Sequence, residues 1–296
     1  MKKTIFTGSA VAIITPMNQD GSINYPELGN VIEHQITHGT DAVVICGTTG
    51  ESSTFSDDEH VECIRYAVEK VAHRVPVIAG TGSNDTAYAV WLSKEAKAAG
   101  ADAQLQVTPY YNKTSQKGLI AHFTAIADAT DLPVILYNVP GRTGVDIKPE
   151  TYAQLAKHPN IVAAKEANGN ITAVARTRAL CGDSLDIYSG NDDQIVPILS
   201  LGGKGVVSVL ANVAPRQAHD ICQLYFDGKT AESAALQIKL IGLIDALFAD
   251  VNPIPVKKAM NLLGWQAGSC RLPLVDPSDA VVELLREQMA RCGVTR

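Results

Sequence analysis

The sequence predicts an α/β protein, a (β/α)8 TIM barrel with a C-terminal three-helix appendix, and two observations support this prediction. Short apolar runs recur eight times along the first three quarters of the chain, and amphipathic segments lie between them. Most runs are rich in valine and isoleucine and lack polar alternation, which is typical of strands that are covered on both faces. Eight such units in a chain of 296 residues favour a closed barrel.

The predicted strands and helices alternate along the chain. We expect strands at residues 10–14, 42–46, 75–80, 103–107, 133–137, 161–165, 185–190 and 205–209. Ser56 and Glu59 have the spacing of a capping box, which predicts a helix that continues to about Val71. Asn84 is expected to start the next helix, and Gly100 to end it. Further helices are expected at 115–129, 149–157, 171–180, 193–201 and 215–226.

An open, doubly wound sheet is the alternative fold. No GxGxxG motif follows the first expected strand, and the strand count of eight also favours the barrel. After about residue 228 the pattern changes, because three helix-like stretches follow without strands, at 230–249, 254–263 and 277–291. We therefore expect a catalytic barrel at residues 1–228 and a helical domain at residues 229–296.

Composition and charge argue against several classes of protein. Hydrophobic residues make up 46% of the chain and charged residues 19%, which is typical of a globular protein and not of a disordered one. The net charge of −6 and the lack of a basic run give no support for nucleic-acid binding. No apolar stretch reaches the roughly 18 residues that cross a bilayer, and the N-terminal apolar run lacks a signal-peptide cleavage site.

The six cysteines lie scattered through the chain. None forms a CxxC motif, and none has a histidine at metal-ligand spacing. We therefore expect reduced, mostly buried thiols in a cytoplasmic protein.

Polar residues follow the ends of the expected strands, where active sites of this architecture lie. They are mostly hydroxyl and amide side chains with one arginine and one lysine, and they are found at 15–16, 47–52, 81–84, 108–112, 137–142, 165–166, 190–192 and 208. No histidine and no cluster of metal-ligand type occurs among them, which argues against a zinc or two-metal hydrolase.

Lys165 is the most informative of these residues, because it ends the apolar run IVAAK. An ammonium group among apolar side chains is disfavoured relative to the neutral amine, and a neutral amine can attack a ketone to form a Schiff base. In the alternative interpretation, Lys165 extends off the strand end and pairs with Glu166 or a helix carboxylate. The expected position at the rim of the barrel favours the Schiff base.

Four other residues have both a chemical and a plain structural interpretation. Tyr137 closes the neighbouring strand, where its phenol could act as a general acid and base or could be a half-buried core residue. Thr48 and Thr49 could donate to a small carboxylate, or their motif GTTGES could form only a tight loop. Arg142 could grip a second carboxylate in a bidentate manner, or it could be a solvated loop residue.

Taken together, five motifs resemble the dihydrodipicolinate synthase family, which is part of the N-acetylneuraminate lyase superfamily of pyruvate-dependent class I aldolases. The motifs are GTTGES (47–52), TPYYN (108–112), YNVPGRTG (137–144), AKEAN around Lys165 and SGND (189–192), and the resemblance covers nearly the whole chain. It implies a barrel with a C-terminal helical domain and a homotetramer built as a dimer of dimers. It also implies condensation of pyruvate with L-aspartate 4-semialdehyde on the route to diaminopimelate and lysine.

The resemblance assigns a role to each matching residue. Lys165 is similar to the lysine that forms the pyruvate imine, so no separate cofactor is expected. Tyr137, Thr49 and Tyr111 match the proton relay, with Tyr111 reaching into the site of a neighbouring subunit. The residues that match substrate-binding positions are Thr48 and Thr49 for the pyruvate carboxylate, Arg142 for the semialdehyde carboxylate, and Gly190 and Val207 for the pocket wall. The family often has isoleucine in place of Val207.

Many members of the family are inhibited by lysine at a subunit interface. Ser52, His60, Asn84 and Tyr110 fit the pattern of lysine-sensitive members. Tyr88 stands where that pattern has a glutamate for the effector's ammonium group, and Asp57 stands where it commonly has a histidine. A lost charge-assisted hydrogen bond costs roughly 1.5–3 kcal/mol, so we expect weak or absent inhibition by lysine.

Two rival functions are considered. N-acetylneuraminate lyase and similar pyruvate aldolases share the lysine and the YNxP tyrosine, but they typically carry Ser-Thr at the position of Thr48 and Thr49 and lack the Arg-Thr pair that follows the turn. Arg142 and the double threonine therefore favour the synthase. A non-catalytic barrel that binds a small molecule is the second rival, and it would need a lost catalytic residue, whereas none is missing here.

Overall fold

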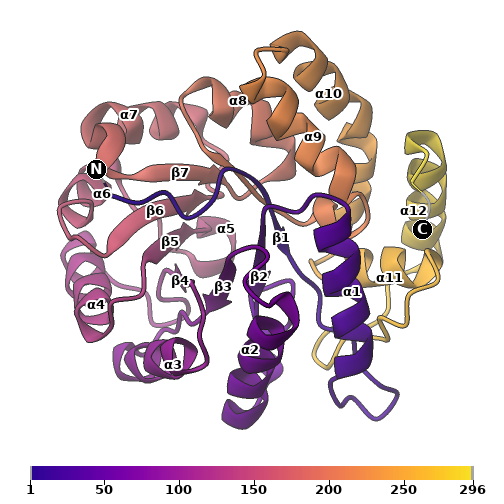
Figure 1. Cartoon of the computed structure of the whole chain (residues 1–296), viewed down its shortest axis with the longest axis horizontal. Coiled ribbons are helices and arrows are strands. Elements are labelled where there is room, and N and C mark those ends of the chain that lie inside the picture. The colour runs from indigo at the N-terminus through magenta and orange to yellow at the C-terminus, as the bar shows by residue number, and fades with distance from the viewer. Residues whose placement is uncertain (1, 295–296) are drawn as a thin grey trace.

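The computed structural model describes residues 2–294, and the strands of these residues form a closed, parallel barrel (Figure 1). The strands pair in chain order and the last pairs with the first. They are β1 (Gly8–Ala12), β2 (Ala42–Ile45), β3 (Val77–Gly80), β4 (Ala103–Val107), β5 (Val134–Asn138), β6 (Ile161–Glu166), β7 (Asp186–Ser189) and β8 (Gly205–Ser208). The prediction of a TIM barrel with C-terminal helices is confirmed.

Helices surround the barrel and follow most of its strands. They are α1 (Tyr25–Thr37), α2 (Asp57–Val71), α3 (Thr86–Ala98), α4 (Gln116–Ala129), α5 (Pro140–Thr143), α6 (Pro149–Leu155), α7 (Ile171–Cys181), α8 (Ile195–Ser200) and α9 (Pro215–Phe226). The predicted capping box is present, because the Ser56 hydroxyl accepts from the Glu59 amide and the Glu59 carboxylate accepts from the Ser56 amide. Helices α1 and α5 were not predicted from the sequence.

Three predicted boundaries were wrong. The first strand lies at Gly8–Ala12 and not at 10–14, because Gly8 already pairs with Gly205 of β8. A Cβ atom at Gly205 would collide with the backbone of Gly8, so a glycine is needed at this pair. Asp85, not Asn84, caps α3, since its carboxylate accepts from the Ala87 amide, while the Asn84 side chain donates to the Tyr110 carbonyl. The helix expected at 193–201 is split into the 3-10 turn Asp192–Gln194 and α8.

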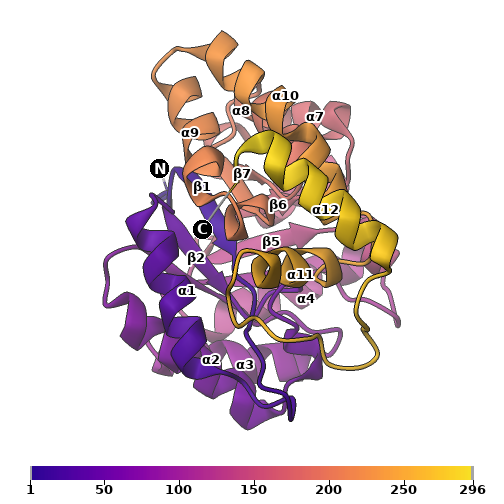
Figure 2. The same cartoon turned by 90° about the vertical axis from the view of Figure 1, so that its right-hand side faces the viewer.

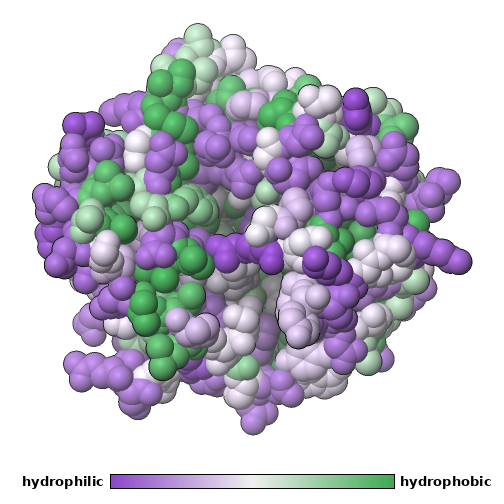
Figure 3. Space-filling model, turned by 180° about the vertical axis from the view of Figure 1, so that it is seen from behind, coloured by the Kyte–Doolittle hydropathy of each residue, from purple (hydrophilic) through white to green (hydrophobic). Residues whose placement is uncertain are grey.

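The inside of the barrel is filled by small and branched side chains, and an aromatic pair closes its amino-terminal end. Phe6 stacks on Tyr188 with the ring centroids 4.2 Å apart, and the Tyr188 hydroxyl donates to the Phe6 carbonyl. The N-terminal segment crosses in front of the barrel in Figure 1. Figure 3 therefore views the carboxyl ends of the strands, and this face is hollowed near its middle.

Three further helices follow the barrel and lie together along one side of it (Figures 1 and 2). They are α10 (Thr230–Leu247), α11 (Ile254–Leu262) and α12 (Asp279–Cys292). Helix α10 packs against α9 of the barrel, and α12 packs against both α10 and α11. The domain boundary near residue 228 stays a prediction. Among residues 2–294, no helix combines the length and the apolar character that a bilayer-crossing segment needs.

Candidate active site

The amine of Lys165 lies inside the barrel at the carboxyl end of β6. Lys165 is only 6% exposed, and its Nζ lies over the ring of Tyr137, 4.1 Å from the ring centroid. The two residues are neighbours because Tyr137 pairs with Lys165 in the register of β5 and β6. The sheet therefore holds a buried amine against the face of a phenol, in a cation–π arrangement.

The next residue of β6, Glu166, points to the opposite face of the sheet, as strand alternation requires. Its carboxylate accepts from the Asn138 side chain at 3.0 Å and 3.2 Å, from the Tyr152 hydroxyl at 2.9 Å and from the Asn168 amide at 3.0 Å. Burial raises the pKa of Glu166 to about 7, in spite of these donors. The interpretation in which Lys165 extends off the strand to pair with Glu166 is therefore wrong.

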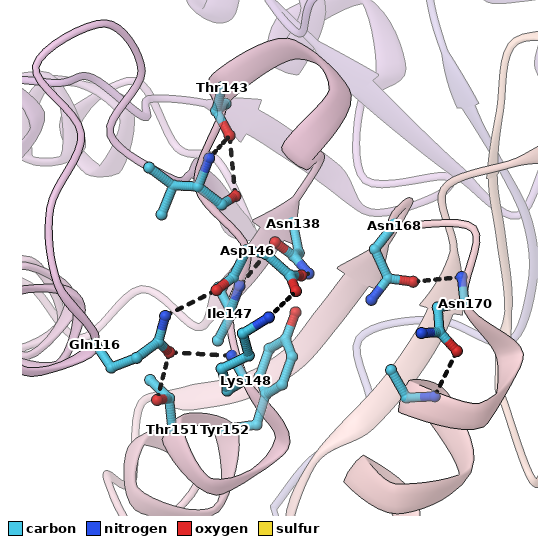
Figure 4. Close-up of polar contacts among 12 residues, drawn as sticks. Gln116, Asn138, Thr143, Asp146, Ile147, Lys148, Thr151, Tyr152, Asn168 and Asn170 are labelled. Carbon is cyan, nitrogen blue, oxygen red and sulfur yellow. Dashed lines mark hydrogen bonds and ion pairs between the residues drawn. The ribbon is translucent and has the colours of Figure 1, made fainter.

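Asn138 connects this outer group to the loop that follows β5. Its side chain donates to Asp146 at 2.9 Å, and its Oδ1 accepts from the Ile147 amide at 3.1 Å. Figure 4 shows these residues with Tyr152, whose hydroxyl points toward the same region, and with Lys148, which pairs with Asp146. The polar network thus holds the outer faces of β5 and β6 directly behind Tyr137 and Lys165.

The loop after β2 carries Thr48 and Thr49 to the rim of the barrel. Thr48 is exposed and Thr49 is buried. Cys46 and Glu51, on either side of the threonines, have φ angles of 56° and 59°, a backbone conformation that side chains rarely adopt. The loop is therefore tightly wound, and surrounding contacts must hold it in place.

Arg142 lies on α5, the single helical turn that follows β5. Its guanidinium is on the exposed side of the turn and donates to the Asn252 carbonyl at 3.1 Å. The neighbouring Thr143 is buried and accepts from the Thr108 hydroxyl at 2.9 Å. Thr143 thus anchors the turn, and Arg142 extends from it to the segment between α10 and α11.

Gly190 lies beside Lys165, and Val207 lies inside the barrel. A Cβ atom at Gly190 would lie 3.2 Å from Cε of Lys165 and 2.8 Å from Cβ of Ala167, so the absence of a side chain leaves room for the lysine. Val207 is buried in the apolar cluster that lines the barrel. Both positions therefore shape the space around the amine.

Tyr111 is not brought to the other three predicted catalytic residues within this chain. It is 93% exposed and has a φ angle of 66°, in the loop after β4. A bulky aromatic side chain that is fully exposed on a strained backbone is unusual in a protein that acts as a single chain.

A cavity of about 500 Å³ joins some of the candidate site residues to most of the effector positions, but Lys165, Thr49 and Asn84 are not among its lining residues. Its lining includes Thr48, Tyr137, Arg142, Ser52, His60, Tyr88 and Tyr110. His60 is turned toward β3, because its Nε2 donates to the Gly80 carbonyl at 2.8 Å. At the edge of the cavity the Tyr88 hydroxyl donates to Asp57 at 2.7 Å, so Asp57 already has a partner.

Two buried residues near the site, Asp192 of the SGND motif and Asn252, were given no role of their own from the sequence. Asp192 is 2% exposed and accepts from the amides of Val209 and Leu210, while its second oxygen has no partner within residues 2–294. Burial raises the pKa of Asp192, and the charge of Lys165 opposes that rise. Asn252, from the segment between α10 and α11, donates to the Thr49 hydroxyl at 3.0 Å. Asp192 lies in the SGND motif at the end of an expected strand, whereas no spacing or periodicity in the sequence points to Asn252.

Within the described part of the chain, no group of three or more histidine, cysteine, aspartate or glutamate side chains could hold a metal ion.

The chain matches one protein family over most of its length. The model of the "Dihydrodipicolinate synthetase family" matches residues 5–290. A protein of Lachnoclostridium phytofermentans, named 4-hydroxy-tetrahydrodipicolinate synthase, is 57% identical over 291 residues, which are 98% of this chain and 99% of that protein.

Solved structures show the same similarity in three dimensions. The chloride-inhibited dihydrodipicolinate synthase of Acinetobacter baumannii, complexed with pyruvate, is 42% identical with a TM-score of 0.96, and the match covers 98% of this chain and all of that one. The enzyme of Cyanidioschyzon merolae with lysine bound is 41% identical with a TM-score of 0.96, over 98% of this chain and 99% of that one.

Proposed function

The chain belongs to the dihydrodipicolinate synthetase family and has the activity of 4-hydroxy-tetrahydrodipicolinate synthase, and we propose that it acts through a pyruvate imine on Lys165. The activity condenses pyruvate with L-aspartate 4-semialdehyde in lysine biosynthesis. The observation that supports the role of Lys165 is its burial inside the barrel mouth, with Nζ 4.1 Å from the Tyr137 ring centroid.

The reaction begins when the neutral Nζ of Lys165 attacks the keto carbon of pyruvate. Proton transfers through Tyr137 and Thr49 allow the carbinolamine to lose water and form the imine. The imine carbon then accepts electrons as the methyl group loses a proton, and the resulting enamine forms a carbon–carbon bond with the aldehyde carbon of the second substrate. The amino group of that substrate finally attacks the imine carbon, which closes the ring and releases Lys165.

Two carboxylates have to be held during these steps. Thr48 lines the same cavity as Tyr137 and Thr49 follows it in the loop, and the two threonines supply hydroxyl groups and backbone amides for the carboxylate of pyruvate. Arg142 extends over the rim and supplies a guanidinium for the carboxylate of the semialdehyde. The Acinetobacter baumannii enzyme, which shares this fold, is complexed with pyruvate, and this supports pyruvate as the first substrate.

Tyr111 completes the proton relay in the site of a second copy of the chain. Its exposure of 93% and its strained backbone support this assignment, because the side chain extends away from its own subunit. The resulting assembly is a homodimer, or a homotetramer formed by two such dimers.

Borohydride reduction in the presence of pyruvate tests the imine. We expect a single pyruvate adduct that peptide mapping places on Lys165, and no adduct in Lys165→Met. An adduct on another lysine, or wild-type protein that stays unmodified, would contradict the proposal.

Mixing two inactive variants tests the role of Tyr111. Tyr111→Phe and Lys165→Met should each lack turnover, while subunits exchanged between them form sites that hold an intact lysine and an intact tyrosine. We expect partial recovery of activity after exchange. If activity does not recover although mixed dimers are detected, Tyr111 does not act across the interface.

L-Lysine is a weak inhibitor of this chain, or none at all. The lysine-bound enzyme of Cyanidioschyzon merolae shows that an enzyme of this fold can bind the effector. Here Tyr88 donates to Asp57, so an incoming ammonium group has to replace an existing hydrogen bond. We expect activity to persist when lysine is titrated, and Tyr88→Glu to increase sensitivity. Near-complete inhibition of the wild type at submillimolar lysine would refute this proposal.

A further inference from the structure

The segment between α10 and α11 reaches into the barrel mouth at Asn252. Asn252 is buried, and its Nδ2 donates to the Thr49 hydroxyl oxygen at 3.0 Å. Its backbone carbonyl accepts from Arg142 at 3.1 Å. One residue of the C-terminal region therefore contacts two residues of the proposed site.

The hydrogen bond from Asn252 constrains the direction of the Thr49 proton. A hydroxyl group has one proton to donate, and an amide N–H can only donate. The Nδ2 group of Asn252 occupies one acceptor position of the Thr49 Oγ1 atom, so the hydroxyl proton of Thr49 has to point in another direction. In that direction the proton is available to the relay and to the substrate. A hydroxyl that rotates freely spends part of its time in unproductive orientations.

A buried ion pair holds this segment against the β2 loop. Lys257 of α11 lies 2.7 Å from Glu51, and the two side chains are 2% and 1% exposed. The other carboxylate oxygen of Glu51 accepts from the Arg271 amide at 2.8 Å, and Lys257 also donates to the Ser269 carbonyl at 2.9 Å. The distance between Asn252 and Thr49 is therefore fixed by contacts on both sides of the hydrogen bond.

We propose that Asn252 is a positioning residue, which orients the Thr49 hydroxyl for proton transfer and makes the C-terminal helical region part of the active site. This inference rests on the proposed function, because it assumes that Thr49 relays protons. The Oδ1 of Asn252 has no hydrogen-bond partner within residues 2–294, so the amide is held by a single side-chain contact, and that contact is with Thr49.

Side-chain replacements isolate the contact with Thr49, because the Arg142 contact uses the backbone of Asn252. Asn252→Ala removes the donor, and Asn252→Asp keeps the shape but replaces the donor with an acceptor. We expect both variants to lower kcat by about 100-fold, as a misplaced catalytic group does. We expect KM for pyruvate to change little, and the borohydride adduct on Lys165 to form to the same final extent as in the wild type.

Asn261→Ala is the matched control. Asn261 lies in the same region, and its side chain bonds the backbone of Ala267 and Gly268 but no residue of the site. We expect its kcat to remain at the wild-type value. A drop equal to that of Asn252→Ala would overturn the proposal, because general loosening of the C-terminal helices would then explain both variants.

The decisive test combines Asn252→Ala with Thr49→Val, which lacks the hydroxyl. If Asn252 acts through the Thr49 hydroxyl, Asn252→Ala should have no further effect on kcat once that hydroxyl is absent. Additive losses, or a wild-type rate in Asn252→Asp, would overturn the proposal. A wild-type protein that forms no adduct on Lys165 would instead refute the proposed function, so the two failures are distinguishable.

Discussion

The strand pair β5–β6 and the loop after β2 both carry groups of the proposed site, but they are held in different ways. Tyr137 and Lys165 are fixed by the register of two hydrogen-bonded strands, and the Asn138–Glu166 contact supports the same register from the outer face. The loop at 47–52 has no such ladder and depends on Asn252, Lys257 and Arg271 from the C-terminal region.

The difference shows how the two kinds of position respond to change. A sheet positions side chains through the hydrogen bonds of its backbone, and these bonds stay intact when a side chain is replaced. A strained loop between left-handed residues is positioned through side chains from elsewhere in the chain. We therefore expect single side-chain replacements to disturb the loop more strongly than the strands, and four predictions test this comparison.

Lys257→Met should have the largest effect on stability. It leaves the Glu51 carboxylate buried without its cation, which typically costs about 3–5 kcal/mol in the free energy of unfolding. Urea unfolding at one protein concentration measures the loss. The double variant with Glu51→Gln should recover part of it, because no unpaired charge remains. A loss below about 1 kcal/mol would mean that the ion pair does not hold the loop.

Glu166→Gln should change the pH dependence of stability. Folding raises the pKa of Glu166 from 4.5 to about 7, so the folded state keeps a proton that the unfolded state releases. The free energy of unfolding of the wild type should therefore fall between pH 4.5 and 7 by about 3 kcal/mol, at about 1.4 kcal/mol per pH unit.

Glu166→Gln lacks this contribution, so its stability relative to the wild type should rise over the same pH range. Urea unfolding of both proteins at several pH values measures the difference, which cancels the contributions of other groups. A constant difference between the two proteins would show that the Glu166 carboxyl does not hold its proton in the folded state.

Gly190→Ala should have a moderate effect, because the added Cβ meets Ala167 and Lys165 on the inner side of the strand pair. Overpacking of this kind costs roughly 1–3 kcal/mol, and displacement of the lysine should slow adduct formation with pyruvate. Gly141→Ala is the control, since nothing lies within 4 Å of a Cβ atom at that position. Equal adduct rates in all three proteins would show that Gly190 does not shape the site.

Ser56→Ala should have the smallest effect, a loss of about 1 kcal/mol, because the cap of α2 is a local contact just beyond the loop. Ser115→Ala removes the corresponding cap of α4, far from the loop, and should cost a similar amount. Thermal unfolding compares the two variants. A much larger loss at Ser56 would show that the cap also supports the loop.

Local patterns predicted much of the fold. The helix at Pro215–Phe226 was found at its predicted residues, and the Ser56 capping box formed as its spacing indicated. The first strand was misplaced because the apolar run Ala10–Ile14 conceals that Gly8 already pairs with β8. A helix start was assigned to Asn84 because asparagine and aspartate are equally good caps, and only the structure shows which one faces the helix.

The sequence by itself determined the barrel, the C-terminal helices, and the presence of Lys165, Tyr137, Thr48, Thr49 and Arg142 at strand ends. These features follow from periodicity and from motifs, which act over a few neighbouring residues. Only the tertiary structure decided which donors surround Glu166, that Asn252 reaches Thr49, and that Lys257 pairs with Glu51. The last two contacts join residues that are 203 and 206 positions apart, and a contact between such distant residues leaves no periodic pattern in a single sequence.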